Sequence, residues 1–367
     1  MYLLSYSFFS TDSQGMASTS SSELKFSSST STVSDPSATQ RSRILSSKLY
    51  FDVPLSRVSV IYSPSYDIAF FGIEKLHPFD SSKWGRVCTF LVDSHVLERS
   101  NIIEPHEASE DDLLVVHSEA YLSSLRSSLT VASIIEVPLT ACLPFFLLQR
   151  KVLQPFRKQV GGTILAAKVA KERGWAINIG GGFHHCSSEL GGGFCVYADI
   201  SLCIHFAFVR LNISRVMIVD LDAHQGNGHE RDFSNDKRVF ILDMYNPLIY
   251  PLDNEARAYI DLDVKVMTGT STTDYLSKLD EALEVSSQKF DPELIVYNAG
   301  TDILDGDPLG RLKVSPDGVT LRDEKVFAFA RQRKVPIVML TSGGYTKASA
   351  RVVADSIINL SKKSLIS

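Results

Sequence analysis

Six short, almost continuously apolar runs recur along the chain. They lie at residues 58–63, 175–180, 216–222, 239–245, 294–300 and 335–344. Strands that are buried on both faces of a parallel sheet have this pattern, whereas half-exposed strands alternate between apolar and polar positions. The pattern therefore predicts the strands of a buried, mainly parallel sheet.

Helix-like stretches separate several of these runs. Residues 162–174 end at Gly174 after Lys171 and Arg173, a typical C-terminal signal of a helix. Residues 272–290 begin with capping candidates, and residues 315–334 precede the last apolar run. The alternation predicts a single-domain, doubly wound α/β fold, in which helices flank a mainly parallel sheet.

The composition changes near Lys48. Residues 1–47 are rich in Ser and Thr and poor in acidic residues, so this segment is predicted to be a disordered tail. Residues 48–362 have the composition of one globular, catalytic domain. Ser-rich, acid-poor N-termini also resemble organelle transit peptides, so a targeting segment is the alternative to a plain tail.

Charge and cysteine content narrow the class of protein. A net charge of −5 argues against a protein that coats nucleic acid, because phosphate binding needs clustered Lys and Arg. The five cysteines form no CxxC pair and indicate a reduced intracellular compartment. No apolar run reaches the about 18 residues of a membrane span. The nearest, residues 131–148, predicts buried loop and helix, with an apolar groove for an acyl chain or a membrane surface as the alternative.

Polar side chains follow four of the predicted strands. In doubly wound sheets, ligands bind beyond the carboxyl ends of the strands. The four ends supply His184 and His185, then Asp222 and His224, then Asp302, and finally Tyr345. Any one of these could be accidental, but four together predict a functional site.

Asp222, His224 and Asp302 have the chemistry of an open metal site. Asp222 and His224 are two positions apart and project to the same side of an extended segment, where Asp302 can join them from another strand. Two carboxylates and one imidazole leave a fourth position for water, as in catalytic zinc sites. The alternative is that Asp222 caps the next helix and His224 is an ordinary loop histidine. The adjacent histidine pair and Asp302 favour the metal site.

The tandem histidines suit acid–base chemistry beside such a metal. Zinc lowers the pKa of its water to ~7, and a nearby imidazole can take the proton and return it to a leaving amine. Tyr345 follows two glycines and could direct its hydroxyl toward a developing oxyanion. Phe183 and Phe194 follow glycine runs and either pack in the core or line a slot for an aliphatic chain.

Together, the segments GGGFHHCSSELGGGFC, VDLDAHQGNG, NAGTDILDGD and TSGGY resemble the zinc-dependent histone deacetylases. HPFDSSKWGRV and EASEDDLLVVHS are similar to class IV of that family. The resemblance extends from about Val53 to Leu360 and implies an arginase/deacetylase-like fold. The implied activity is hydrolysis of the amide of N6-acyl-lysine.

The resemblance also implies a metal set. One zinc ion per chain is held by Asp222, His224 and Asp302. A structural potassium ion lies against the backbone of the same segment, near Asp243 and Met244.

The remaining implied roles are catalytic. His185 is the general base and acid, His184 is its electrostatic partner, and Tyr345 donates to the substrate carbonyl. Asp220 orients His184, and Asn227 is the partner of His185. His229 and Glu230 are expected to begin the next helix rather than to bind metal. The implied walls of an acyl-lysine tunnel are Phe183, Gly193 and Phe194.

Partners and location follow from the resemblance alone. It implies acyl-lysine proteins such as histone tails as substrates, corepressor complexes as partners, and residence in the nucleus or cytoplasm, or in a plastid if residues 1–47 are a transit peptide. No direct nucleic-acid binding and no transmembrane segment are expected. The alternatives are a small-molecule acyl-amine deacetylase and a catalytically weak corepressor scaffold. A two-metal arginase-type hydrolase would need a further Asp where Gly226 and Asn227 stand.

Asn227 is the informative departure from classes I and II, which usually carry Asp at this position. An amide oxygen still accepts a hydrogen bond, but it has no charge to stabilise an imidazolium on His185. Class IV shares the Asn, so its presence does not imply inactivity.

Asn227→Asp is therefore expected to raise the pKa of His185. The acid limb of the pH–rate profile for deacylation should then move to higher pH, because the base becomes protonated earlier on acidification. An unchanged profile would contradict the assigned partnership.

Overall fold

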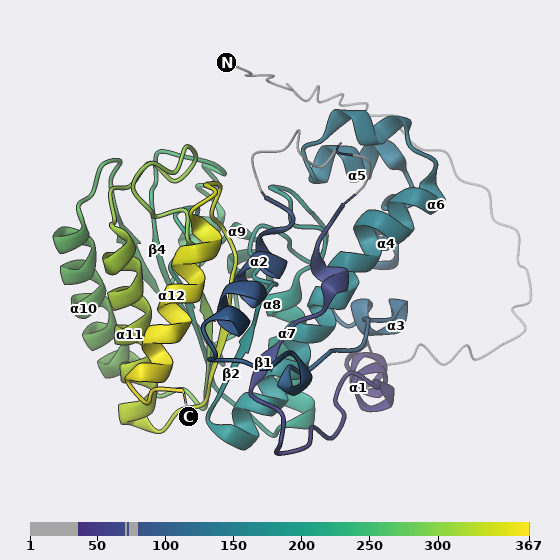
Figure 1. Cartoon of the computed structure of the whole chain (residues 1–367). Helices are drawn as coiled ribbons and strands as arrows, with labels where there is room; N and C mark the ends of the chain where they lie inside the picture. Colours follow the sequence, from purple (N-terminus) through teal and green to yellow (C-terminus); the bar gives the residue numbers. More distant parts are fainter. Residues whose placement is uncertain (1–35, 70–71, 73–79, 367) are drawn as a thin grey trace, which may run out of the picture. The chain divides into compact units, whose positions relative to one another are not determined.

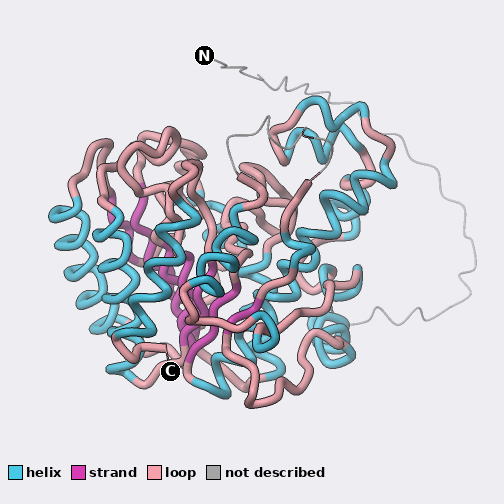
Figure 2. The backbone as a smooth tube through the Cα atoms, in the orientation of Figure 1, coloured by secondary structure: helices cyan, strands magenta, loops and turns pink. Residues whose placement is uncertain are grey.

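The computed structural model describes residues 36–69, 72 and 80–366. These residues form a seven-stranded, entirely parallel sheet in the order β1-β2-β7-β6-β3-β4-β5 (Figures 1 and 2). The strands are β1 Val60–Ile61, β2 Trp175–Asn178, β3 Val216–Asp220, β4 Val239–Tyr245, β5 Leu262–Lys265, β6 Leu294–Asn298 and β7 Ile337–Leu340. The predicted doubly wound α/β fold is confirmed.

Both faces of the sheet are covered by helices. In β3, Val216 and Ile218 belong to one core and Met217 and Val219 to the other, so every residue along the strand is buried. One face packs against α7 Gln154–Arg173 and α8 Asp199–Arg210. The other packs against α2 Lys83–Asp93, α10 Thr272–Lys289, α11 Pro316–Arg333 and α12 Ser349–Lys362; α10, α11 and α12 lie side by side in Figure 1.

Shorter helices complete the described chain. They are α1 Pro36–Ser46, α3 Glu110–Leu113, α4 Glu119–Ser124, α5 Ser128–Ile134, α6 Phe145–Leu148 and α9 Asn227–Asp232. Residues 131–148 run through α5, a 3₁₀ helix at Pro138–Cys142 and α6, so the expectation of loop and helix is confirmed. The expectation that they are buried holds only in part, because Leu139 is 56% exposed and Phe146 is 68% exposed. Among the described residues, no helix combines the length and the apolar character that crossing a membrane requires.

The apolar pattern placed six strands and missed one. All six predicted runs contain a strand, and β4 matches its run from end to end. The missed strand, β5, lies at the sheet edge and alternates between half-buried and exposed residues. Helix α7 ends at Gly174 as predicted, with φ of +87°, but it begins earlier, at Gln154, with proline in its first turn.

The expectation that residues 1–47 are disordered is wrong for residues 36–46, which form α1. Ile44 is fully buried in the core that also contains α8, and Gln40 donates its side-chain N–H to the carbonyl of Val115 at 2.7 Å. The buried Ile44 and hydrogen bonds such as that of Gln40 dock this polar helix. Residues 1–35 lie outside the described residues, so the expectation for them stays a prediction.

We expect Ile44→Ala to lower the free energy of unfolding by about 2–4 kcal/mol, because it leaves a cavity under α1. The matched control is Leu45→Ala, one residue further along and 52% exposed, which should change stability by no more than about 0.5 kcal/mol. Urea unfolding measures both variants. Equal effects would show that α1 does not depend on its buried residue.

Candidate active site

The candidate site lies at the carboxyl ends of four neighbouring strands. β2, β7, β6 and β3 are adjacent in the sheet, although they are far apart in the sequence. Because all four are parallel, the segments that follow them meet at one edge. Those segments carry the histidine pair, Tyr345, Asp302 and the Asp222–His224 pair, so the structure brings the predicted side chains together.

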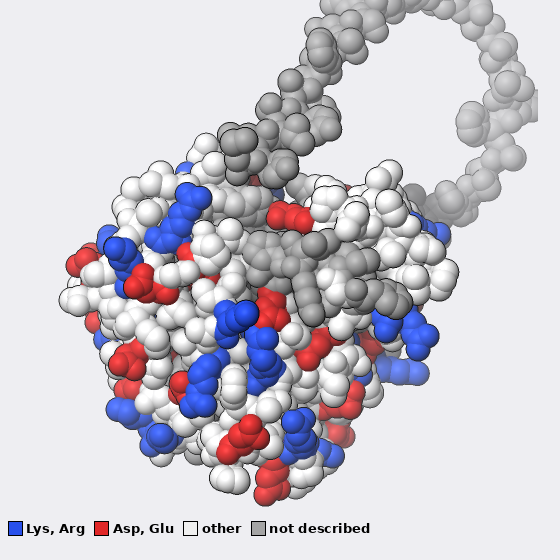
Figure 3. Space-filling model, turned by 45° about the horizontal axis from the view of Figure 1, so that its top comes forward, with Lys and Arg blue, Asp and Glu red and all other residues white. Residues whose placement is uncertain are grey.

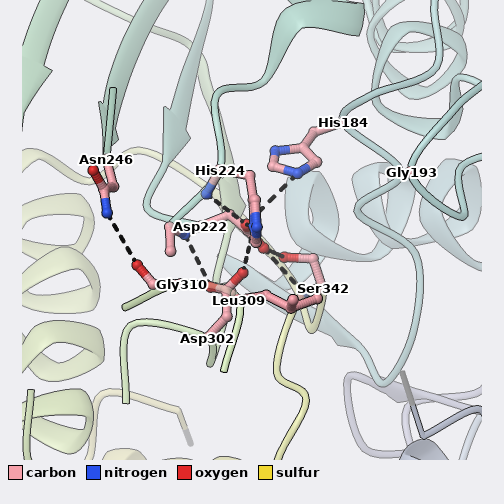
Figure 4. Close-up of polar contacts among 12 residues, drawn as sticks. His184, Gly193, Asp222, His224, Asn246, Asp302, Leu309, Gly310 and Ser342 are labelled. Atoms are coloured by element: carbon pink, nitrogen blue, oxygen red, sulfur yellow. Dashed lines mark hydrogen bonds and ion pairs between the residues drawn. The ribbon is translucent and has the colours of Figure 1, made fainter. Parts of the chain in front are cut away.

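Asp222, His224 and Asp302 converge on one point (Figure 4). The Nδ1 atom of His224 lies 3.1 Å from Oδ1 of Asp222 and 2.8 Å from Oδ2 of Asp302. One ligand atom from each residue lies within 4.8 Å of the other two, and all three residues are buried. Two carboxylates and an imidazole are donors that suit a divalent transition metal.

Hydrogen bonds from neighbouring loops fix the two carboxylates. Oδ2 of Asp222 accepts from the hydroxyl of Ser342 and the backbone N–H of Gly343, both at 3.1 Å. Oδ1 of Asp302 accepts from the N–H of Ala223 at 2.9 Å. A Cβ atom at Gly343 would lie 2.3 Å from Asp222, so only glycine allows this approach. The loops after β7, β6 and β3 therefore hold one another in place.

The electrostatics of this point favour a positive charge. Burial lowers the pKa of His224, but hydrogen bonds to Asp222 and Asp302 outweigh it and raise the pKa to about 10. Burial and the nearby Asp222 raise the pKa of Asp302 to about 7. Two buried carboxylates in contact attract a cation, and a metal ion would satisfy the same demand.

The two histidines of the pair have different partners. Nδ1 of His184 lies 2.9 Å from Oδ2 of Asp220, and Nδ1 of His185 lies 2.9 Å from Oδ1 of Asn227. Burial lowers the pKa of His184, but Asp220 outweighs it and raises the pKa to about 9. Burial, followed by the charges of His184 and His224, holds the pKa of His185 well below its usual value. At neutral pH one imidazole is charged and its neighbour is neutral.

Asp220 contacts two further residues in addition to His184. Its Oδ2 also lies 2.8 Å from Nε2 of His229, and its Oδ1 accepts from the side-chain amide of Asn298 at 3.0 Å. His229 lies in α9, as expected. With His184 and Asp220 it forms a second buried group whose ligand atoms lie within 4.8 Å of one another. In the sheet register Asp220 pairs with Asp243, which places Asp243 and Met244 at the adjacent strand end.

A narrow cavity leads to these groups. Its lining consists of Trp84, Gly181, Gly182, Phe183, His184, His185, Gly193, Phe194, Cys195, Asp222, Ser342, Gly343 and Tyr345. The rings of Phe183 and Phe194 both pack edge-on against Phe156, at 5.0 and 5.4 Å between centroids. A Cβ atom at Gly193 would lie 2.6 Å from the ring of His185. All three predicted tunnel residues therefore lie in the wall.

Tyr345 lies in the loop that follows β7. Its backbone N–H donates to Oδ2 of Asp307 at 2.8 Å, which anchors the residue after its two glycines. Its ring centroid lies 6.0 Å from that of His224. The side chain lines the cavity beside the candidate metal ligands.

Three contributors were not predicted. Lys83 is fully buried and donates to the carbonyls of Ser342 and Gly343, the latter at 2.7 Å, although it lies about 260 positions away in the sequence. Burial lowers the pKa of Lys83 to about 8. Trp84 lines the cavity, and the ring of Tyr250 lies edge-on to His185 at 4.8 Å. For Lys83 and Trp84 the only signal was the segment KWGRV, which contributed to the family resemblance, and Tyr250 had none.

Comparison with known proteins places this site in a family. A family model described as the histone deacetylase domain matches residues 77–360. Histone deacetylase 2 of Arabidopsis thaliana is 72% identical over 339 residues, covering 92% of this chain and 88% of that protein. An uncharacterized protein of Picosynechococcus is 30% identical over 289 residues, covering 78% of this chain and 92% of that protein.

A solved structure confirms the fold. The crystal structure of the HDA15 HD domain matches with a TM-score of 0.68 at 19% identity, covering 84% of this chain and 89% of that one. The family model spans well over half of the chain, and its match includes every residue of the site described above. This chain belongs to the histone deacetylase family.

Proposed function

We propose that this lysine deacetylase uses one zinc ion, held by Asp222, His224 and Asp302, and that His185 is its general base. Family membership establishes the hydrolysis of acyl-lysine amides. The observation that carries the assignment of residues is the buried convergence of three metal donors beside one neutral imidazole. When bound, zinc supplies Lewis acidity toward water and the amide carbonyl.

The chain's own groups move the proton. Asn227 Oδ1 accepts from Nδ1–H of His185, which leaves Nε2 of the neutral imidazole free to take a proton from water and return it to the lysine amine. His184, held by Asp220, would stabilise the oxyanion that develops nearby. The hydroxyl of Tyr345 donates to the same oxygen.

The cavity fits an extended aliphatic chain. Phe183, Phe194 and Gly193 form apolar walls that leave a slot narrow enough for the methylenes of a lysine side chain. On the face shown in Figure 3, Lys and Arg side chains are interspersed with Asp and Glu. The described residues of this face lack the clustered Lys and Arg that a nucleic acid would need, which favours a protein substrate over a nucleic acid.

Class, potassium and location are further parts of the proposal. The KWGRV and EASEDDLLVVHS segments support a class IV enzyme; His77, Pro78 and Phe79 of the longer motif lie outside the described residues. A structural potassium ion near Asp243 and Met244, corepressor partners, chromatin and transcription regulation, and nuclear or cytoplasmic residence rest on family resemblance. Imaging of the full chain distinguishes these locations from a plastid.

Zinc binding should release protons. In metal-free protein His224 is protonated at neutral pH, because its pKa is about 10, and zinc must displace that proton. We expect chelator-stripped protein to release about one proton or more per zinc near neutral pH, so that zinc affinity rises with pH up to about 10. Calorimetry in two buffers of different ionisation enthalpy measures the release. Zinc binding without proton release would contradict this ligand set.

His185→Ala should lower kcat/KM for an acetyl-lysine peptide by about 100-fold or more, and Tyr345→Phe by about 100–1,000-fold, with zinc retained. The control Tyr259→Phe removes a hydroxyl outside the cavity lining and should leave turnover unchanged. Zinc content is measured on the same preparations. Near-normal turnover by His185→Ala would refute its role as base.

A panel of substrates tests the substrate class. Acetylated peptides, long-chain acylated peptides and small acylated amines are compared on one zinc-quantified preparation. Hydrolysis of the small amines alone would favour the small-molecule alternative. Bound zinc without hydrolysis of any substrate would favour a scaffold.

A further inference from the structure

Asn227 has a second hydrogen-bond partner behind the active site. Its Nδ2 atom lies 3.2 Å from Oδ2 of Asp253, while its Oδ1 faces His185 at 2.9 Å. A carboxylate accepts hydrogen bonds and cannot donate them. The NH₂ group of Asn227 must therefore face Asp253, and this contact turns the amide oxygen toward the imidazole.

Asp253 is itself held firmly. Arg231 donates to both of its oxygens, with Nε 3.0 Å from Oδ2 and Nη2 2.8 Å from Oδ1, and the backbone N–H of Ala256 donates to Oδ1 at 3.1 Å. Gln225 donates to the backbone carbonyl of Asp253 at 3.0 Å. Arg231 and Asn227 lie one turn apart in α9, so the same helix holds the carboxylate and presents the amide.

Asp253 carries a negative charge at neutral pH. Burial raises the pKa of its carboxyl, but hydrogen bonds from Ala256, Arg231 and Asn227 outweigh burial and hold the pKa below its usual value. Its side chain is 15% exposed, which shields it from most of the competing water. A charged acceptor binds the amide NH₂ more strongly than a neutral one.

The orientation of this amide decides which nitrogen of His185 carries the proton. With Oδ1 toward the ring, Nδ1 is the donor and Nε2 is unprotonated. If the amide turned over, its NH₂ would face Nδ1, and the ring would have to carry its proton on Nε2. That tautomer cannot accept a proton from water on Nε2.

We propose that Asp253 is a positioning residue for deacylation, which selects the base-competent tautomer of His185 by orienting the amide of Asn227. Asp253 thus supplies the carboxylate that Asn227 lacks, and it acts on His185 through the amide of Asn227. The same turn contributes the ring of Tyr250, edge-on to His185, so residues 250–253 contact the imidazole and its partner together. This inference rests on the proposed role of His185.

A carboxylate–amide exchange tests the inference. Asp253→Asn removes the charged acceptor while preserving the side-chain shape, and both orientations of Asn227 then become accessible. We expect the plateau kcat to fall by about 10–100-fold with KM changed by less than about threefold. Asn227→Asp alone places two carboxylates in contact and should also lower the plateau kcat, in addition to moving the acid limb.

The double variant, Asn227→Asp with Asp253→Asn, again pairs a hydrogen-bond donor with an acceptor at each contact. A carboxylate at position 227 accepts from Nδ1–H of His185 through one oxygen and from the amide at position 253 through the other. We expect its plateau kcat to return to within about threefold of the unmodified enzyme. The loss of the Arg231 ion pair is common to Asp253→Asn and the double variant, so a purely structural role would leave both equally impaired.

The control is Glu255→Gln. Glu255 also contacts Arg231, at 3.3 Å, but its side chain is 71% exposed and it belongs to neither the base nor its partner. This variant should retain full activity. Thermal unfolding and zinc content are measured for every variant, so a loss of fold or metal is separated from a loss of positioning.

The outcomes are distinct. Loss of kcat in Asp253→Asn with recovery in the double variant supports the positioning role. A loss of less than about threefold in Asp253→Asn, or a double variant as impaired as Asp253→Asn, overturns it. His185→Ala is assayed in parallel: if it retains turnover, the proposed base is wrong, which is a separate failure from that of Asp253.

Discussion

The contact of two buried carboxylates, Asp222 and Asp302, with the imidazole of His224 is the constraint on which the site depends. Removing these carboxylates from water costs free energy unless a positive charge lies between them. Hydrogen bonds donated by the loops after β3 and β7 hold them in place, and the carboxylates of Asp222 and Asp302 raise the pKa of His224. The hydrogen bonds that shape this edge of the sheet therefore also create the candidate metal site.

The histidine pair shows how surroundings assign different states to identical side chains. His184 faces the carboxylate of Asp220, and His185 faces the neutral amide of Asn227. The first is charged and the second neutral, which is the division of labour that an electrostatic stabiliser and a base require. The amide is in turn oriented by Asp253, so the state of the base depends on a residue that does not itself line the cavity.

Much of the fold and of the candidate site could be predicted from local sequence patterns. Strands buried on both faces were visible as continuous apolar runs, whereas β5 was missed because an edge strand has one exposed face and an alternating pattern. The metal ligands and tandem histidines stood directly after those runs. Helix α1 was missed because its composition is polar, and its docking depends on the buried Ile44 and on hydrogen bonds to residues far away in the sequence.

The sequence by itself determined the strand–helix alternation, the residues at each strand end and the Asn beside the base, because these depend on local composition and order. Only the tertiary structure decided which strand ends are neighbours, and hence that Lys83 supports the loop after β7 and that Asp253 orients Asn227. Such contacts join positions far apart in the chain, and their strength comes from burial and from the direction of individual hydrogen bonds. No local pattern encodes either property.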